Sequence, residues 1–201
     1  RHQTLRAMVD WSWSLLSESE RTVLARLAVF PAGIDAKEAQ LFARSMGLAT
    51  ADEFDNLVDK SLLQRVRGRF RALETIREYG IERLAEAGAL FEARLAQASY
   101  MAELAVRQDA LLRGPEIYSA IFWFDAEEDN LAAALRFSMQ DDLAELAVGL
   151  VAACAWYWLI RDRNQDAQAW LLQADGRYER ATPRADMPHS AQTALLARLC
   201  P

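Results

Sequence analysis

Apolar residues recur every three or four positions along most of this chain, and one stretch of ten residues breaks that rhythm. Phe54, Leu57 and Leu62 follow helical spacing, but apolar and polar residues alternate over residues 63–72, on both sides of Gly68. Helical spacing returns at Glu74. Because a period of 3.6 is typical of helices and a period of two is typical of strands, this stretch predicts a helix, a β-hairpin and a second helix.

Three further helices are predicted before this segment. Ser17 and Glu20 form the S-x-x-E pattern of a capping box, which places a helix start at Ser17. The segment 29–34 is predicted to add a short third strand. One hairpin behind three helices is typical of a winged-helix domain, which we predict for residues 1–88. The predicted helices cover about residues 4–17, 18–30, 35–44, 50 or 52 to 62, and 74–87.

The second half of the chain predicts helices only. They cover about residues 89–110, 115–138, 141–160, 163–179 and 190–199, with a polar link at 180–189. The pair 141–160 and 163–179 sets small residues against large tryptophans, which is typical of one unit of an α-solenoid. A further helix begins near residue 190, so we expect a truncated helical array over residues 89–201. The predicted fold class is mainly α, a winged helix followed by a tetratricopeptide-like α-solenoid segment.

Charge and composition narrow the class of protein. The net charge is −6 and 52% of the residues are hydrophobic, which is enough for a packed core. Residues 1–88 hold 13 basic and 13 acidic side chains, whereas residues 89–201 hold 10 and 16. The acidic half is therefore a poor surface for nucleic acid. No apolar run approaches the roughly 20 residues that span a bilayer, and the N-terminus lacks a signal-peptide core, so we expect a soluble cytoplasmic protein with no membrane partner.

Catalytic and metal-binding motifs are missing. The two lysines, Lys37 and Lys60, follow no glycine-rich loop, so this chain alone is not expected to hydrolyse ATP. The two histidines, His2 and His189, cannot assemble a zinc site or a catalytic triad. Cys154 and Cys200 are expected to be small hydrophobic residues rather than a disulfide. We predict no catalytic residues, no metal and no cofactor on this chain.

The densest acidic cluster has two interpretations. One interpretation is a metal site. The preferred interpretation is the start of a helix, with Asp125 as its N-cap and the other carboxylates complementing the helix dipole. The cluster consists of Asp125, Glu127, Glu128 and Asp129.

The hairpin carries the one suggestive charge pattern. Four arginines alternate with smaller or apolar residues, which predicts guanidinium groups along the outward face of a wing and around its tip. Such a wing could bind phosphates of DNA or of a nucleotide. An interpretation at least as well supported pairs them with carboxylates on neighbouring helices. These candidate phosphate- or DNA-contacting residues are Arg65, Arg67, Arg69 and Arg71.

The helix before the hairpin argues against DNA reading. In a DNA-binding winged helix this element would enter the major groove and would need a polar or basic surface. Here four carboxylates face one ammonium group, and they would repel the phosphate backbone. They are Asp52, Glu53, Asp55 and Asp59, against Lys60. A role facing protein or nucleotide fits this segment better.

Several strings resemble a known family when taken in order. They are R-H-Q-T-L-R-A-M-V-D-W-S-W-S-L-L-S at 1–17, R-L-A-V-F-P-A-G at 26–33, L-V-D-K-S-L at 57–62, R-F-R-A-L-E-T-I-R-E-Y at 69–79 and E-D-N-L-A-A-A-L at 128–135. These resemble the segment that follows the nucleotide-binding core in bacterial STAND-class ATPase transcriptional regulators, of the bacterial activator domain type. The last string is similar to the start of their tetratricopeptide-like array.

The resemblance implies a piece of a larger switch protein. In such regulators the winged helix is similar to a latch that packs on the ADP-bound core and swings away when ATP enters. The partners implied are the nucleotide-binding core of the same protein, an inducer or protein at the helical array, and DNA through a separate effector domain. The resemblance implies that the parent protein binds ATP or ADP and hydrolyses ATP. Related switches place a histidine on the ADP phosphate, but Leu73 stands at that position and cannot donate a hydrogen bond.

Together these observations predict a non-catalytic regulatory and protein-interaction module of an ATP-dependent transcriptional regulator. The alternative is a winged helix that binds DNA directly through its arginine-rich wing. A third hypothesis, a nucleotide-dependent enzyme activity on this chain, would require turnover that depends on the chain's own residues.

Overall fold

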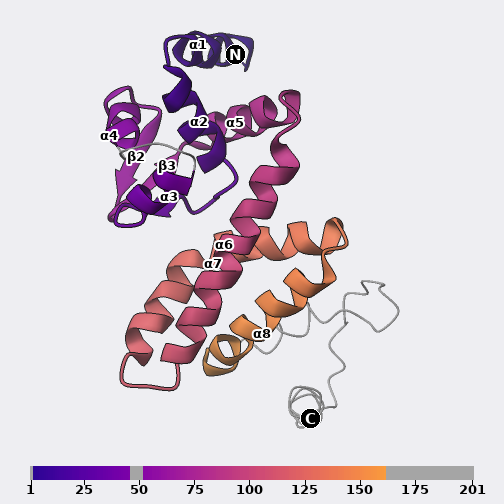
Figure 1. Cartoon of the computed structure of the whole chain (residues 1–201). Helices are drawn as coiled ribbons and strands as arrows, with labels where there is room; N and C mark the ends of the chain where they lie inside the picture. Colours follow the sequence, from indigo (N-terminus) through magenta and orange to yellow (C-terminus); the bar gives the residue numbers. More distant parts are fainter. Residues whose placement is uncertain (1, 46–51, 162–201) are drawn as a thin grey trace. The chain divides into compact units, whose positions relative to one another are not determined.

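The computed structural model describes residues 2–45 and 52–161 (Figure 1). The chain divides into two compact units, Arg1–Tyr157 and Trp158–Pro201, and the fold and the sites lie in the first. The predicted helices at 163–179 and 190–199 fall outside the described residues, as do Thr50, His189 and Cys200. The second member of the predicted solenoid pair therefore stays a prediction.

Helices dominate the described chain, and one small sheet interrupts them, so the predicted mainly α fold with an N-terminal winged helix is confirmed. In chain order the elements are α1 (His2–Ser14), α2 (Glu18–Leu27), β1 (Ile34–Asp35), α3 (Ala39–Ser45), α4 (Asp52–Asp59), β2 (Leu63–Val66), β3 (Arg69–Ala72), α5 (Glu74–Glu86), α6 (Leu90–Leu111), α7 (Ile117–Gln140) and α8 (Ala144–Ile160).

The sheet has three antiparallel strands in the order β1-β3-β2. Arg67 and Gly68 form the two-residue turn between β2 and β3, and both have positive φ, at 51° and 80°. Positive φ at both turn positions suits the twist of a tight hairpin. The predicted hairpin at 63–72 is confirmed, and the predicted third strand is present as Ile34–Asp35, at the end of the expected segment.

A chain of aromatic side chains forms the centre of the winged helix. Phe30 packs edge-on against Phe42, with ring centroids 5.3 Å apart, and Phe42 lies 6.2 Å from Phe54. Phe54 then lies 5.0 Å from Phe70 of β3. Tyr100 of α6 extends the series, because its ring lies 6.4 Å from that of Phe30. The core thus runs without interruption from the sheet to the first helix after the winged helix.

The capping box predicted for α2 is confirmed. The Glu20 backbone N–H donates to Ser17 Oγ at 3.2 Å, and the Ser17 backbone N–H donates to Glu20 Oε2 at 2.8 Å. Two of the otherwise unsatisfied N–H groups at the helix start are thereby paired. Helix α1 lies against α5 through the Tyr79 hydroxyl, which donates to Asp10 Oδ1 at 2.6 Å.

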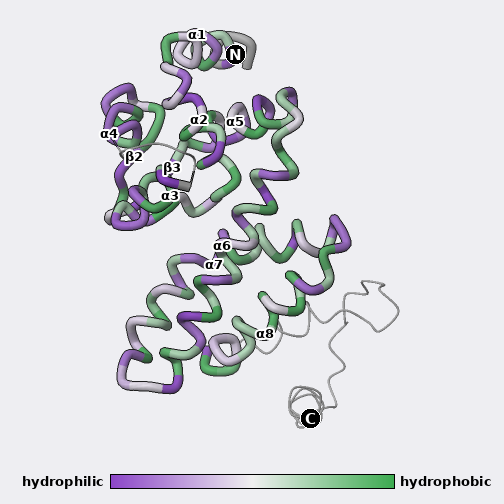
Figure 2. Tube along the Cα trace, in the orientation of Figure 1, coloured by the Kyte–Doolittle hydropathy of each residue, from purple (hydrophilic) through white to green (hydrophobic). Residues whose placement is uncertain are grey.

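Helices α6 and α7 pack closely on each other. Along α7 the buried positions recur every three or four residues, and two of them, Glu127 and Asn130, are polar. Helix α8 is mostly green and white in Figure 2, because Glu145 is its one charged residue. No helix among the described residues is long and apolar enough to cross a membrane. The domain boundary near residue 88 and the tetratricopeptide-like character of the array stay predictions.

The interpretation of the acidic cluster as a helix start is wrong. Helix α7 begins at Ile117, so Asp125 lies in its interior and cannot cap it. The Asp125 carboxylate instead accepts a hydrogen bond from the Tyr157 hydroxyl of α8 at 2.5 Å. In the described part of the chain no three His, Cys, Asp or Glu residues gather as a metal site.

Candidate functional site: the wing and its junction with helix α7

The four arginines of the wing do not share one face. The register pairs Arg65 with Phe70 and Gln64 with Arg71 across the strands, because a two-residue turn places odd positions of one strand opposite even positions of the other. Arg65 therefore lies on the same face as buried Phe70, and Arg69 and Arg71 lie on the opposite face. The prediction of one outward row of guanidinium groups is wrong for this reason.

Arg65 remains close to its own domain. Its guanidinium carbon lies 5.4 Å from the centre of the Phe70 ring, and its Nη1 lies 3.9 Å from Asp55 Oδ1 of α4. Both partners of this pair are largely exposed, so the ion pair itself adds little stability. It does place one wing cation against the acidic helix α4.

Arg69 is turned inward and is held at three points. Its Nη1 donates to Glu127 Oε1 of α7 at 2.5 Å, its Nε donates to the Ala32 carbonyl at 3.1 Å, and its Nη2 donates to the Gly33 carbonyl at 2.9 Å. The side chains of Arg69 and Glu127 are only 17% and 5% exposed. Arg69 also lines the groove of the wing, but its charge is already compensated by Glu127. The alternative that pairs wing arginines with carboxylates is therefore correct for Arg65 and Arg69.

Asn130 completes the same cluster. Its Oδ1 accepts from the Ala32 backbone N–H at 3.0 Å, while its Nδ2 donates to the Gly33 carbonyl at 2.9 Å and to Glu127 Oε2 at 2.6 Å. We call Arg69, Glu127, Asn130 and the Ala32–Gly33 backbone the junction cluster. It joins the wing, the loop before β1 and helix α7 through hydrogen bonds that are buried or partly buried, where unpaired groups would be costly.

A second polar contact lies beside the junction cluster. The Tyr100 hydroxyl of α6 donates to Glu38 Oε2 at 3.0 Å. Burial raises the pKa of Glu38, and the negative charges of Glu127 and Asp35 add to that rise against the opposing hydrogen bond from Tyr100. Burial and the carboxylate of Glu38 likewise raise the pKa of the Tyr100 hydroxyl above its usual range.

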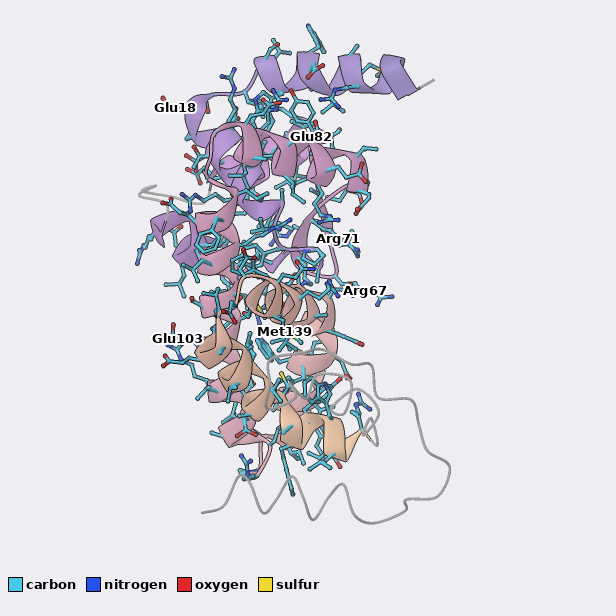
Figure 3. The ribbon with its side chains drawn as sticks, turned by 90° about the vertical axis from the view of Figure 1, so that its right-hand side faces the viewer. Glu18, Arg67, Arg71, Glu82, Glu103 and Met139 are labelled. Carbon is cyan, nitrogen blue, oxygen red and sulfur yellow. The ribbon has the colours of Figure 1, made fainter. Side chains whose placement is uncertain are left out.

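Arg67 and Arg71 are the wing arginines that form no ion pair with a described residue. Both are exposed and lie on the same side of the molecule in Figure 3. They line a shallow groove of about 620 Å³ together with Leu73, which is 45% exposed, and the carboxylate of Glu74. Leu73 thus lines this groove and has no group that could donate a hydrogen bond to phosphate.

Helix α4 presents acidic residues on its exposed side. Asp52, Asp55 and Asp59 are exposed, while Phe54 and Leu57 are fully buried against the domain. The nearby ammonium group of Lys60 points the other way, because its Nζ lies 2.5 Å from buried Glu20. The arrangement leaves α4 with a negative solvent face.

The sequence interpretation did not predict that Glu127 pairs with Arg69. It also did not predict that Asn130 and Gln97 are buried polar residues. A signal existed, since Glu127 and Asn130 occupy positions of the apolar stripe of α7. A polar group on such a stripe must find a partner in the core. Gln97 of α6 shows the same logic, because its Nε2 donates to the Asn130 carbonyl at 2.9 Å.

Comparison with known proteins agrees with this architecture. A winged helix-turn-helix domain model matches residues 16–85, the segment from the loop before α2 to the end of α5. No solved structure matches the chain.

Two mycobacterial proteins illustrate the similarity to curated sequences. "Putative HTH-type transcriptional regulator Rv0890c" of Mycobacterium tuberculosis is 31% identical over 192 residues, which is 90% of this chain and 21% of that protein. "Uncharacterized protein Rv0894" of the same organism is 43% identical over 94 residues, which is 43% of this chain and 24% of that protein. The chain therefore spans about a fifth to a quarter of the length of these relatives, and residues 16–85 carry a winged helix-turn-helix domain.

Proposed function

We propose that this chain is a non-catalytic regulatory segment of a transcriptional regulator, and that its winged helix binds protein rather than reading DNA through α4. The observation that carries this proposal is the acidic solvent face of α4, whose neighbouring cation Lys60 is bound to Glu20. A negative surface at that position opposes the phosphate backbone. The similarity to a protein named as a transcriptional regulator supports the regulatory role.

The finer proposal is a nucleotide-dependent latch in the cytoplasm. The winged helix would pack on an ATP- or ADP-binding core elsewhere in the parent protein, and the helical array would receive an inducer or partner protein. The junction cluster supports this idea, because it links β3 and the loop before β1 to α7 by hydrogen bonds. A movement of α7 caused by a partner that binds the helical array would therefore also move the wing. A switch needs such an element with two states that ligands can bias.

A salt titration tests the protein-binding role. The purified chain is titrated into double-stranded DNA at about 50 mM and 200 mM salt, a range over which phosphate-driven binding falls steeply. We expect no binding tighter than the micromolar level of nonspecific contacts. Tight, salt-sensitive binding would overturn the proposal. Measurement of nucleotide turnover by the same sample tests the non-catalytic role, with no turnover expected.

The second candidate is DNA binding through the wing, and the exposure of Arg67 and Arg71 favours it. In that case the double variant Arg67→Gln and Arg71→Gln would abolish the binding seen with the unmodified chain. Arg107→Gln is the matched control, because Arg107 is an exposed arginine of α6 that forms its ion pair with Glu103 of the same helix. Equal loss in the control would indicate attraction by overall charge rather than by the wing.

The latch itself is tested on the full-length regulator. Hydrogen exchange of residues 63–74 is compared between the ADP-bound and ATP-bound forms. We expect slower exchange in the ADP-bound form, because a docked wing excludes water from its backbone. Identical exchange in both forms would contradict the latch.

A further inference from the structure

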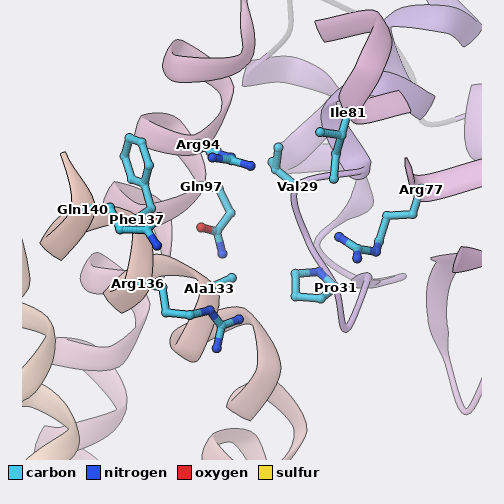
Figure 4. A pocket seen from close by; sticks show the side chains of 10 residues that line it. All are labelled: Val29, Pro31, Arg77, Ile81, Arg94, Gln97, Ala133, Arg136, Phe137 and Gln140. Carbon is cyan, nitrogen blue, oxygen red and sulfur yellow. The ribbon is translucent and has the colours of Figure 1, made fainter. Parts of the chain in front are cut away.

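We propose that a pocket between the winged helix and helices α6 and α7 binds a compact, multiply charged oxyanion of the phosphate class. The pocket has a volume of about 220 Å³. Three arginines from three different helices line it: Arg77 of α5, Arg94 of α6 and Arg136 of α7. Figure 4 shows the three guanidinium groups arranged around a common space, with the amide of Gln97 between them.

The charge of the lining sets the sign of the ligand. No acidic residue lines the pocket, although the chain as a whole carries a net charge of −6. Arg77 is partly committed, since its Nη2 donates to Glu74 Oε1 at 2.6 Å and its Nη1 lies 3.5 Å from the Ala28 carbonyl. Arg94 and Arg136 form no ion pair or hydrogen bond with any described residue. The lining thus carries two cations without a counter-charge and a third that is partly compensated, which favours an anion as the ligand.

Spacing along the helices explains why these groups converge. Arg94 and Gln97 are three residues apart on α6, and Arg136 and Gln140 are four apart on α7, so each pair lies on one helix face. The two faces are held toward the winged helix by the junction cluster, to which Gln97 is itself hydrogen-bonded through the Asn130 carbonyl. Guanidinium groups and amide N–H groups are the donors that match the oxygens of phosphate.

The size of the pocket limits the ligand. A volume of about 220 Å³ lies below the roughly 300–1,000 Å³ that is typical for drug-sized ligands. The pocket therefore accepts a free phosphate or pyrophosphate ion, or the phosphate end of a larger molecule whose remainder stays outside. This site is separate from the wing groove and does not depend on the proposed latch, since none of the four wing arginines lines it.

Calorimetric titration of the whole chain with pyrophosphate tests the site, in a phosphate-free buffer at constant ionic strength. We expect a Kd below about 1 mM. Arg94→Gln and Arg136→Gln should each weaken binding by about tenfold or more, because each removes a charge-assisted hydrogen bond. Arg107→Gln on the exposed side of α6 should leave the Kd within about twofold, since a distant surface charge is screened by salt.

Thermal denaturation separates a ligand role from a structural one. Neither Arg94 nor Arg136 has an ionic partner among the described residues, so the variants should melt at or above the temperature of the unmodified chain without ligand. Absence of binding at millimolar pyrophosphate, or equal weakening by Arg107→Gln, would overturn the proposal.

Titration with ADP and with adenosine identifies the source of the phosphate. If ADP and pyrophosphate bind equally, the site takes a phosphate group without further contacts. If ADP binds more tightly and both variants still weaken it, the site holds the phosphate end of a larger molecule. Binding of adenosine with an affinity equal to that of ADP would contradict an oxyanion site.

Discussion

At the scale of single residues, Glu127 is the group on which the junction cluster depends most. Replacing it by glutamine leaves the Arg69 guanidinium buried without a counter-charge. Breaking a buried ion pair from one side costs about 3–5 kcal/mol, so we expect Glu127→Gln to lower the free energy of unfolding by an amount in that range. Urea-induced unfolding followed by circular dichroism measures the change.

The matched control is Glu103→Gln on α6. Glu103 pairs with Arg107 at i,i+4 on an exposed helix face, where such pairs contribute about 0.3–0.5 kcal/mol. If both variants lost the same small amount of stability, the Arg69–Glu127 contact would be no stronger than a surface pair. Replacing both Arg69 and Glu127 by apolar residues should cost less than Glu127→Gln alone, because no buried charge is then left behind.

Glu38 predicts a pH dependence of stability. Its pKa is raised above 4.5 in the folded chain, mainly by burial, so the folded state holds this proton more tightly than the unfolded state. The stability contributed by the protonated form is present below pH 4.5 and is lost as the pH rises through the raised pKa. Glu38→Gln keeps an oxygen that can accept from Tyr100 but has no proton to lose.

The stability advantage of Glu38→Gln over the unmodified chain should therefore be smallest at acidic pH and should grow toward neutral pH. Urea-induced unfolding at several pH values between about 4 and 7 measures the difference. A difference that does not change with pH would show that Glu38 is not desolvated by folding.

At the scale of elements, substitutions of two glycines beside the strands distinguish the effect of backbone strain from that of a steric clash. Gly33 and Gly68 both have positive φ, at 68° and 80°. A Cβ atom on Gly33 would lie 2.0 Å from the Phe70 carbonyl oxygen, whereas a Cβ atom on Gly68 would meet nothing within 4 Å. Gly68→Ala should lower the free energy of unfolding by about 1–2 kcal/mol, because an alanine is strained in the left-handed conformation and meets no steric clash there.

Gly33→Ala should cost considerably more than Gly68→Ala, because β1 must move away from β3 as well. Thermal denaturation of the two variants side by side measures the gap. Equal melting temperatures would show that the β1–β3 approach is looser than the contacts of Gly33 indicate.

The same sheet shows where sequence patterns suffice and where they do not. Alternation over residues 63–72 was enough to predict the hairpin, since period-two spacing is a local property. The prediction of an outward row of arginines was wrong because the face on which each side chain lies depends on the length of the turn. With a two-residue turn, odd-numbered residues of β2 lie opposite even-numbered residues of β3. The capping box at Ser17 was predictable for the opposite reason, because all its partners lie within four residues.

At the scale of the whole molecule, the contacts that matter most are distant in sequence. Arg69 and Glu127 are 58 residues apart, and Ala32 and Asn130 are 98 apart. No local pattern links such pairs, so periodicity predicted the helices on both sides of the junction and not the cluster that joins them. The pocket of Arg77, Arg94 and Arg136 escaped prediction in the same way, because each arginine is unremarkable within its own helix.

A cluster that joins the winged helix to α7 should make the two parts open together. Asn130→Ala leaves the Ala32 N–H without its side-chain partner, while the Gly33 carbonyl loses one of its two donors and keeps Arg69. Each buried group left unpaired costs about 1–3 kcal/mol, and about 1.4 kcal/mol corresponds to tenfold faster hydrogen exchange. We expect amides of β1 and β3 and amides of α7 near residues 127–134 to exchange at least tenfold faster, as one group.

Tyr157→Phe is the control for this comparison. It removes the hydrogen bond to Asp125 on the same helix α7 but touches none of the winged helix contacts of the junction cluster. Exchange in β1 and β3 should therefore stay unchanged in this variant. If Asn130→Ala accelerated exchange in α7 while leaving the sheet protected, the winged helix and the helical array would open separately, and the array could not transmit a bound partner to the wing through these contacts.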